Sequence, residues 1–184
     1  MGYLILVLGV AIWWVAHLFK RVAPERRAAM GNKGRGLVAA ALGLSIVLMV
    51  IGFKQAEHID FWYPPSMMIH ANNLLVLIAI WMMSPAGQKG KLLQGVRHPM
   101  LMGFGIWAAA HLLVNGDLAS VVLFGGLLAW AVAEVVVINA AEPEWEPRTD
   151  GSIAKDGMFM AGSVVLLAVI GYIHGWLGYW PFAG

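Results

Sequence analysis

The sequence contains no cysteine and few charged residues. The lack of cysteine excludes disulfides, thiolate metal sites and cysteine nucleophiles. Charged residues make up 12% of the chain and the formal net charge is only +2, which does not indicate a nucleic-acid partner. Hydrophobic residues make up 60% of the 184 residues, and the mean hydropathy is +0.75. This composition is typical of a membrane protein, whose principal partner is the lipid bilayer.

Six segments are apolar enough to cross a bilayer as helices. A spanning helix needs about 20 apolar residues, so the shorter segments would need local thinning of the bilayer. The predicted spans are residues 3–19, 37–53, 66–83, 99–114, 118–138 and 158–177. No basic residue precedes the first span, so we do not expect it to be a cleaved signal peptide. The sequence predicts one all-α transmembrane domain over residues 1–184, a polytopic bundle of about six helices.

The basic residues predict the orientation of these helices. Eleven of the twelve lie in the first, third and fifth connections between spans, and only Lys54 lies elsewhere. Because Lys and Arg are enriched in cytoplasmic loops, these three connections are expected in the cytoplasm. Both termini are then expected outside, in the periplasm if the protein resides in the inner membrane of a Gram-negative bacterium.

Ionisable side chains form two layers when depth is counted along each predicted helix at about 1.5 Å per residue. The outer layer holds His70, His111 and His174, and the cytoplasmic layer holds His17, His98 and Glu134. His98 and His111 are thirteen residues apart on one helix, so they lie at its opposite ends and do not share a site. Arg97 and His98 are expected to cap that helix at its cytoplasmic end, with Pro99 in the first turn.

The histidines have two interpretations. A single imidazole near a helix end usually reaches interfacial water or bonds a neighbouring helix. Three at one depth on different helices favour a site, because ionisable groups are costly inside a membrane. Asn115 and Asn73 lie one turn from His111 and His70 and are expected to fix their tautomers. Imidazole suits haem iron, copper or zinc, and Trp107 and its apolar neighbours suit a haem cleft.

Several segments resemble the NnrU family of small integral membrane proteins. They are "AHLFKRVAP" in the first span, "GNKGRGL" before the second, "RHPMLMGFGIWAAAHLLVNGDLASVVLFGGLLAWA" and the terminal "IHGWLG". The "RHP" element alone also occurs in membrane methyltransferases of the isoprenylcysteine type. The acidic and arginine motif that those enzymes carry near the C-terminus has no counterpart here, which favours the NnrU resemblance.

The resemblance implies a role in denitrification, through the expression or activity of nitrite and nitric oxide reductases. The plant relative 15-cis-ζ-carotene isomerase is similar in the same motifs and uses histidine-ligated haem b. This similarity implies His111 as one haem ligand and His17 as the other, whereas the depth count favours His70 or His174 as the partner of His111. Three functions therefore stay open: a haem protein of nitrogen-oxide respiration, a haem-dependent isomerase of a lipophilic polyene, and a non-catalytic assembly factor acting with a reductase.

Overall fold

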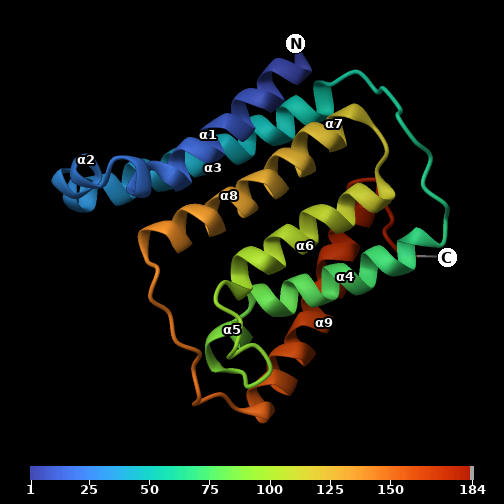
Figure 1. The fold of residues 1–184 in the computed structure, drawn as a ribbon. Coiled ribbons are helices and arrows are strands. Elements are labelled where there is room, and N and C mark those ends of the chain that lie inside the picture. The colour runs from blue at the N-terminus through green and yellow to red at the C-terminus, as the bar shows by residue number, and fades with distance from the viewer. Residues whose placement is uncertain (183–184) are drawn as a thin grey trace. The chain divides into compact units, whose positions relative to one another are not determined.

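The fold is built from helices. A computed structural model describes residues 1–182, and within them no strand occurs, although two isolated bridges pair Asp60 with Asp117 and Gly90 with Ser152. The helices, in chain order, are α1 (Gly2–Val22), α2 (Pro24–Ala29), α3 (Gly31–Gln55), α4 (Met68–Met83), α5 (Ala86–Lys89), α6 (Pro99–Val114), α7 (Leu118–Ser120), the π-helix η1 (Val121–Gly125), α8 (Gly126–Ala141) and α9 (Ile153–Trp176) (Figure 1). The predicted all-α membrane fold is confirmed.

Four of the helical segments are long and apolar enough to cross a membrane: α1, α3, the continuous run from α7 through α8, and α9. Helices α4 and α6 are apolar but contain only 16 residues each. At 1.5 Å per residue they measure about 24 Å, less than the roughly 30 Å of hydrocarbon in a typical bilayer. These two helices therefore need a thinner bilayer if they span it fully, as the sequence predicted for its shorter segments.

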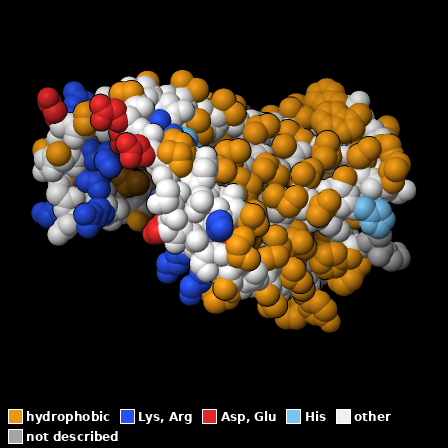
Figure 2. Space-filling view, turned by 60° about the horizontal axis from the view of Figure 1, so that its bottom comes forward, with side chains coloured by type: hydrophobic (Ala, Val, Ile, Leu, Met, Phe, Trp, Pro, Cys, Tyr) orange, Lys and Arg blue, Asp and Glu red, His pale blue; other side chains and the backbone are white. Residues whose placement is uncertain are grey.

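The surface matches a lipid environment. Large apolar side chains are exposed along the long helices, among them Leu4, Val15, Val47 and Val165. Figure 2 shows hydrophobic side chains over most of the visible surface, with the charged side chains gathered together instead of interspersed among them. A soluble protein rarely exposes so much contiguous apolar surface, so contact with the bilayer follows from the fold. The predicted placement of both termini outside stays a prediction.

The chain divides into two compact units, which we describe separately. The first comprises residues 1–63 and 116–141, and the second comprises residues 64–115 and 142–184. In the first unit, α1 and α3 lie side by side and antiparallel (Figure 1), and α8 packs on α1. Close approach of α1 and α3 depends on glycine, since a Cβ on Gly9 would lie 2.8 Å from the backbone nitrogen of Met49. The prediction of a single domain is not tested by this division.

The second unit contains α4, α5, α6 and α9. Helix α4 packs along α6 and also contacts α9. One core cluster consists of Val76, Ile80 and Ala110, against which Trp107 and Ile170 pack. A second cluster, which consists of Trp81, Met82, Ala86 and Leu93, adjoins the first at the C-terminal end of α4. Together these clusters hold α4, α6 and α9 as one packed body and so fix the height of the side chains at the ends of these helices.

Candidate histidine sites

His111 lies near the C-terminal end of α6 and is half-buried. Its Nδ1 lies 2.8 Å from the carbonyl oxygen of Trp107, one helical turn earlier, and the two rings are 4.9 Å apart between centroids. A carbonyl oxygen only accepts hydrogen bonds, so Nδ1 carries the proton and donates it. Nε2 is then the basic nitrogen, the form in which imidazole binds a metal.

His174 repeats this arrangement on α9. Its Nδ1 donates to the carbonyl oxygen of Ile170 at 2.8 Å, again one turn earlier, and the residue is half-buried. Trp107 and Ile170, whose carbonyls hold the two imidazoles, pack against the same core cluster. His111 directly follows Ala110 of that cluster, and His174 lies one turn after Ile170, so both imidazoles lie next to the same cluster and within electrostatic range of each other.

The side-chain amides of Asn115 and Asn73, predicted to lie beside the outer histidines, donate hydrogen bonds to backbone carbonyl oxygens. The side-chain amide of Asn115 donates to the backbone carbonyl of His111 at 2.8 Å, so it closes the end of α6 and the carbonyl of Trp107 orients the ring. The amide of Asn73 donates to the carbonyl of Pro181 at 3.0 Å. For His111 the prediction that the neighbouring amide fixes the tautomer is therefore wrong, because its Nδ1 bonds the carbonyl of Trp107. For Asn73 and His70 it stays a prediction.

His70 and His98 differ in exposure or position from the pair formed by His111 and His174. His70 is exposed in the first turn of α4, and His98 precedes α6, at the opposite end of that helix from His111. Pro99 occupies the first helical position as predicted, and His98 takes the N-cap position through its backbone. The predicted capping position of His98 is therefore confirmed, although its side chain makes no cap hydrogen bond.

His17 belongs to the first unit, where it lies between two indoles. Its Nδ1 donates to the carbonyl oxygen of Trp13 at 3.0 Å, and its ring lies 4.3 Å from that of Trp13 and 4.4 Å from that of Trp130. Glu134, one turn along α8 from Trp130, is buried and within electrostatic range of His17. His17 and Glu134 thus belong to one cluster, as their common predicted depth suggested, while the two indoles around His17 were not predicted.

The model of the family described as NnrU protein matches residues 5–181 of the chain. The chain belongs to the NnrU family. No curated protein and no solved structure matches it. The match covers nearly the whole of both units, and the family resemblance predicted from the sequence motifs is confirmed.

Two of the NnrU protein's histidines share a local motif that sequence inspection can detect. Trp13 precedes His17 by four residues, and Trp107 precedes His111 by four residues. In both cases the tryptophan carbonyl accepts the Nδ1 proton and the indole packs on the imidazole. The spacing Trp-x-x-x-His within an apolar helix is therefore a sequence signal for an imidazole that is protonated on Nδ1.

The described residues of this NnrU protein offer few clustered side chains that could bind a metal ion. Among residues 1–182, no group of three or more His, Asp or Glu side chains is gathered as a metal site. Sites for zinc or non-haem iron built wholly from three protein ligands thus have no counterpart in the described part of the chain. Haem differs, since its porphyrin supplies four nitrogens and the protein adds one or two axial ligands.

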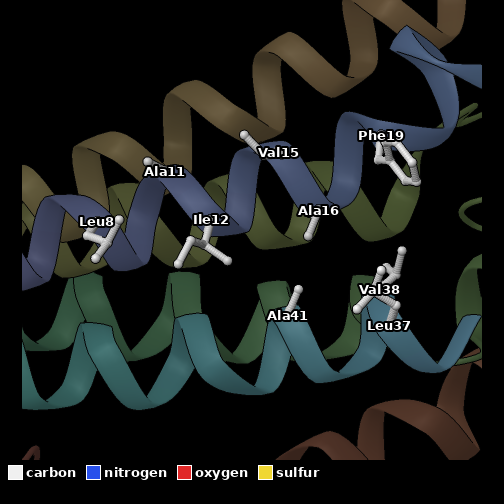
Figure 3. Close-up of a pocket in the computed structure, with 9 residues that line it drawn as sticks. All are labelled: Leu8, Ala11, Ile12, Val15, Ala16, Phe19, Leu37, Val38 and Ala41. Atoms are coloured by element: carbon white, nitrogen blue, oxygen red, sulfur yellow. The ribbon is translucent and has the colours of Figure 1, made fainter. Parts of the chain in front are cut away.

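The first unit of the NnrU protein also carries an apolar groove of about 450 Å³ between α1 and α3. Figure 3 shows side chains from both helices turned toward it, including Leu8, Ile12 and Phe19 of α1 and Leu37 of α3. Every lining residue is apolar, so the groove supplies no acid, base or metal ligand. Its chemistry suits contact with hydrocarbon chains.

Proposed function

We propose that this NnrU protein binds haem b in the bacterial inner membrane and supports the reduction of nitrite and nitric oxide during denitrification. The observation that carries the proposal is the pair formed by His111 and His174. Both imidazoles lie next to the same core cluster, and both donate Nδ1–H to a carbonyl of their own helix. Nε2 is the metal-binding nitrogen of each.

The residues around this pair fit haem by the chemistry of their donors and walls. Neutral imidazoles with a hydrogen-bonded Nδ1–H are the usual axial ligands of haem iron, and that hydrogen bond raises the basicity of Nε2. The indole of Trp107 and the ring of Phe104, 5.2 Å apart between centroids, give α6 an aromatic face on the same stretch of helix. Apolar and aromatic surroundings are what a porphyrin requires.

Haem in such a site supplies a reversible one-electron centre whose potential depends on its axial ligands and its burial. The chain's own part is to hold and orient the ligands. The carbonyls of Trp107 and Ile170 fix the rotation of each ring about its bond to the helix. Trp107 of α6 and Ile170 of α9 pack against the shared cluster, which holds the two helices that carry the histidines.

The test compares histidine variants purified from membranes and assayed for haem per protein and for the Soret spectrum. We expect the wild type to retain haem, and His111→Ala and His174→Ala to lose most of it. His98→Ala is the matched control because it lies on the same helix as His111 at the opposite end. If His98→Ala loses its haem and His111→Ala retains it, the haem site lies at the N-terminal end of α6 and the proposal for His111 is refuted.

Further variants separate the other predicted ligands. His17→Ala and His70→Ala are expected to keep their haem if His174 is the second ligand. Loss in His17→Ala with retention in His174→Ala would assign the second ligand to His17, as the family resemblance implies. A wild type that stays colourless after reconstitution with haem would refute haem binding altogether.

The denitrification role has its own measurement. A denitrifying bacterium lacking its NnrU gene is complemented with wild type or His111→Ala and grown without oxygen on nitrite. We expect the wild type to restore nitrite consumption without accumulation of nitric oxide, and His111→Ala to fail at equal protein abundance. Full restoration by His111→Ala would separate the respiratory role from this histidine.

A further inference from the structure

A second cavity, of about 440 Å³, lies within the second unit between the C-terminal end of α4 and the N-terminal end of α6. Its polar lining consists of Ser84, Gln88, Gln94, Arg97, His98, Trp145 and Arg148. No Asp or Glu is among its lining residues, whereas two of them carry guanidinium groups. A cavity with two fixed positive charges and no acidic group in its wall attracts an anion.

Arg148 is positioned by several hydrogen bonds. Its Nη1 donates to the carbonyl of Gly87 at 3.1 Å, and its Nε donates to the Asp150 carboxylate at 3.0 Å. Its backbone N–H also donates to the carbonyl of Gln94 at 3.2 Å. Its Nη2 is buried and has no hydrogen-bond partner among the described residues. A buried donor of a charged group is costly to leave unsatisfied, so an anionic acceptor that reached this guanidinium would stabilise it.

Arg97 completes the basic wall from the segment that leads into α6. Its Nη2 donates to the backbone carbonyl of Glu142. The acceptor of this bond is a neutral backbone oxygen, so the bond itself does not offset the charge of Arg97. The planar, multiply donating guanidinium of arginine matches the oxygens of a phosphate better than an ammonium group does.

The remaining wall is apolar. Met82 and Met83 from α4 and Met100 and Leu101 from α6 line the cavity beside the arginines. Methionine adapts its shape to flexible apolar partners such as hydrocarbon chains. A ligand that fills this cavity therefore combines an anionic group with an apolar part.

We propose that this cavity binds the phosphate ester of a membrane phospholipid, with the phosphate between Arg97 and Arg148 and the glycerol and upper acyl segments against the methionines. This site is separate from the histidine pair and does not rest on haem binding. The segment carrying it contains Lys89, Lys91 and Arg97, which the positive-inside rule places at the cytoplasmic face, where anionic headgroups lie. The shared chemistry is the phosphate group, and the experiment separates lipid from free phosphate.

The experiment measures binding to the purified full-length protein in a neutral detergent, by native mass spectrometry with titrated ligand. The probes are dioctanoyl phosphatidylglycerol, dioctanoyl phosphatidylcholine and inorganic phosphate. We expect one saturable phosphatidylglycerol per chain, bound more tightly than phosphatidylcholine, and no displacement by an equal concentration of inorganic phosphate. Phosphatidylcholine carries the same phosphate but adds a cationic choline, which the two guanidinium groups repel. Equal binding of the two lipids would therefore overturn the role of the arginines, and displacement by inorganic phosphate would overturn the lipid source.

Three variants locate the site. Arg148→Gln is expected to weaken phosphatidylglycerol binding by about tenfold or more, the effect of losing one charge-assisted hydrogen bond. Lys89→Gln is the matched control, because it removes the same charge from the same segment but does not line the cavity. We expect it to change binding less than about twofold, as surface charges usually do. Equal effects of the two variants would show that only net charge matters and would refute the site.

Asp150→Asn is expected to change the affinity for phosphatidylglycerol in the opposite direction from Arg148→Gln. Misfolding of the variants would not produce such opposite changes. The Asp150 carboxylate offsets the charge of Arg148, so its removal is expected to tighten phosphatidylglycerol binding. A purely structural role for the pair predicts weaker binding in both Arg148→Gln and Asp150→Asn. That pattern would overturn the proposal.

Discussion

Substitution of Gly9 by alanine tests how closely α1 and α3 pack. A Cβ at this position would lie 2.8 Å from the backbone nitrogen of Met49 and 3.0 Å from the carbonyl oxygen of Ser45. Backbone atoms of a helix cannot rotate away as a side chain can. To restore an ordinary contact the two helices must separate by about 0.6 Å, which loosens every interface contact along them.

The expected cost follows from this geometry. Overpacking a well-packed interface typically costs about 1–3 kcal/mol. Replacing glycine by alanine within a helix also gains up to about 1 kcal/mol in helix propensity, which partly hides that cost. Gly43→Ala in α3 is the matched control, because a Cβ there has nothing within 4 Å. The propensity gain is common to both variants, so their difference isolates the steric term.

The assay is unfolding of the purified protein in mixed micelles with increasing dodecyl sulfate, followed by far-ultraviolet circular dichroism. We expect Gly9→Ala to have a free energy of unfolding about 1–3 kcal/mol below that of Gly43→Ala. Equal stabilities of the two variants, or a more stable Gly9→Ala, would refute the close packing of α1 on α3 at this position.

Two further predictions concern polar groups outside the histidine pair. The buried Asp156 carboxylate accepts hydrogen bonds from the backbone nitrogens of Lys91 and Leu92, at 2.7 and 3.1 Å. Asp156→Ala leaves both donors without this acceptor and is expected to cost about 1–3 kcal/mol for each in the same assay, with a smaller loss for Asp156→Asn. Tyr63 donates to Asp60 at 3.2 Å, and this bond raises the pKa of the phenol because ionisation would place two negative charges together. Phenolate absorbance during alkaline titration is expected to show the pKa of Tyr63 falling in Asp60→Asn, and an unchanged curve would contradict the contact.

Hydropathy predicted the cores of the helices and missed their ends. The second predicted span begins at residue 37, whereas α3 begins at Gly31, and the last predicted span begins at residue 158, whereas α9 begins at Ile153. Hydropathy reports where a chain leaves the hydrocarbon, but a helix continues into the polar interface while its backbone hydrogen bonds remain favourable. The first turn of α9 even contains Asp156, whose partners lie in a distant segment and could not be found from local sequence.

Counting residues along each helix predicted the depth of the candidate ligands in the membrane, but it did not predict which side of the helix each one occupies. It grouped His70 with His111 and His174, yet His70 is exposed while the other two are half-buried. The rotation of a residue about its helix depends on which face packs on the neighbours, and the apolar residues of α4 and α6 are spread around both helices. Likewise, the π-helical turn of Val121–Gly125 interrupts a uniformly apolar run that carries no local signal for it.

The common geometry of His17, His111 and His174 explains how an imidazole is tolerated in an apolar helix. A helical carbonyl already accepts the backbone N–H four residues later, and its second lone pair can accept the Nδ1 proton of the same residue. Each of the three imidazoles thereby satisfies one polar nitrogen within its own helix, at no cost to a neighbour. Nε2 is then the one ring nitrogen that must be satisfied from outside the helix. Because burial of an unsatisfied polar atom is costly, whatever fills that position in the folded membrane protein contributes to stability as well as to function.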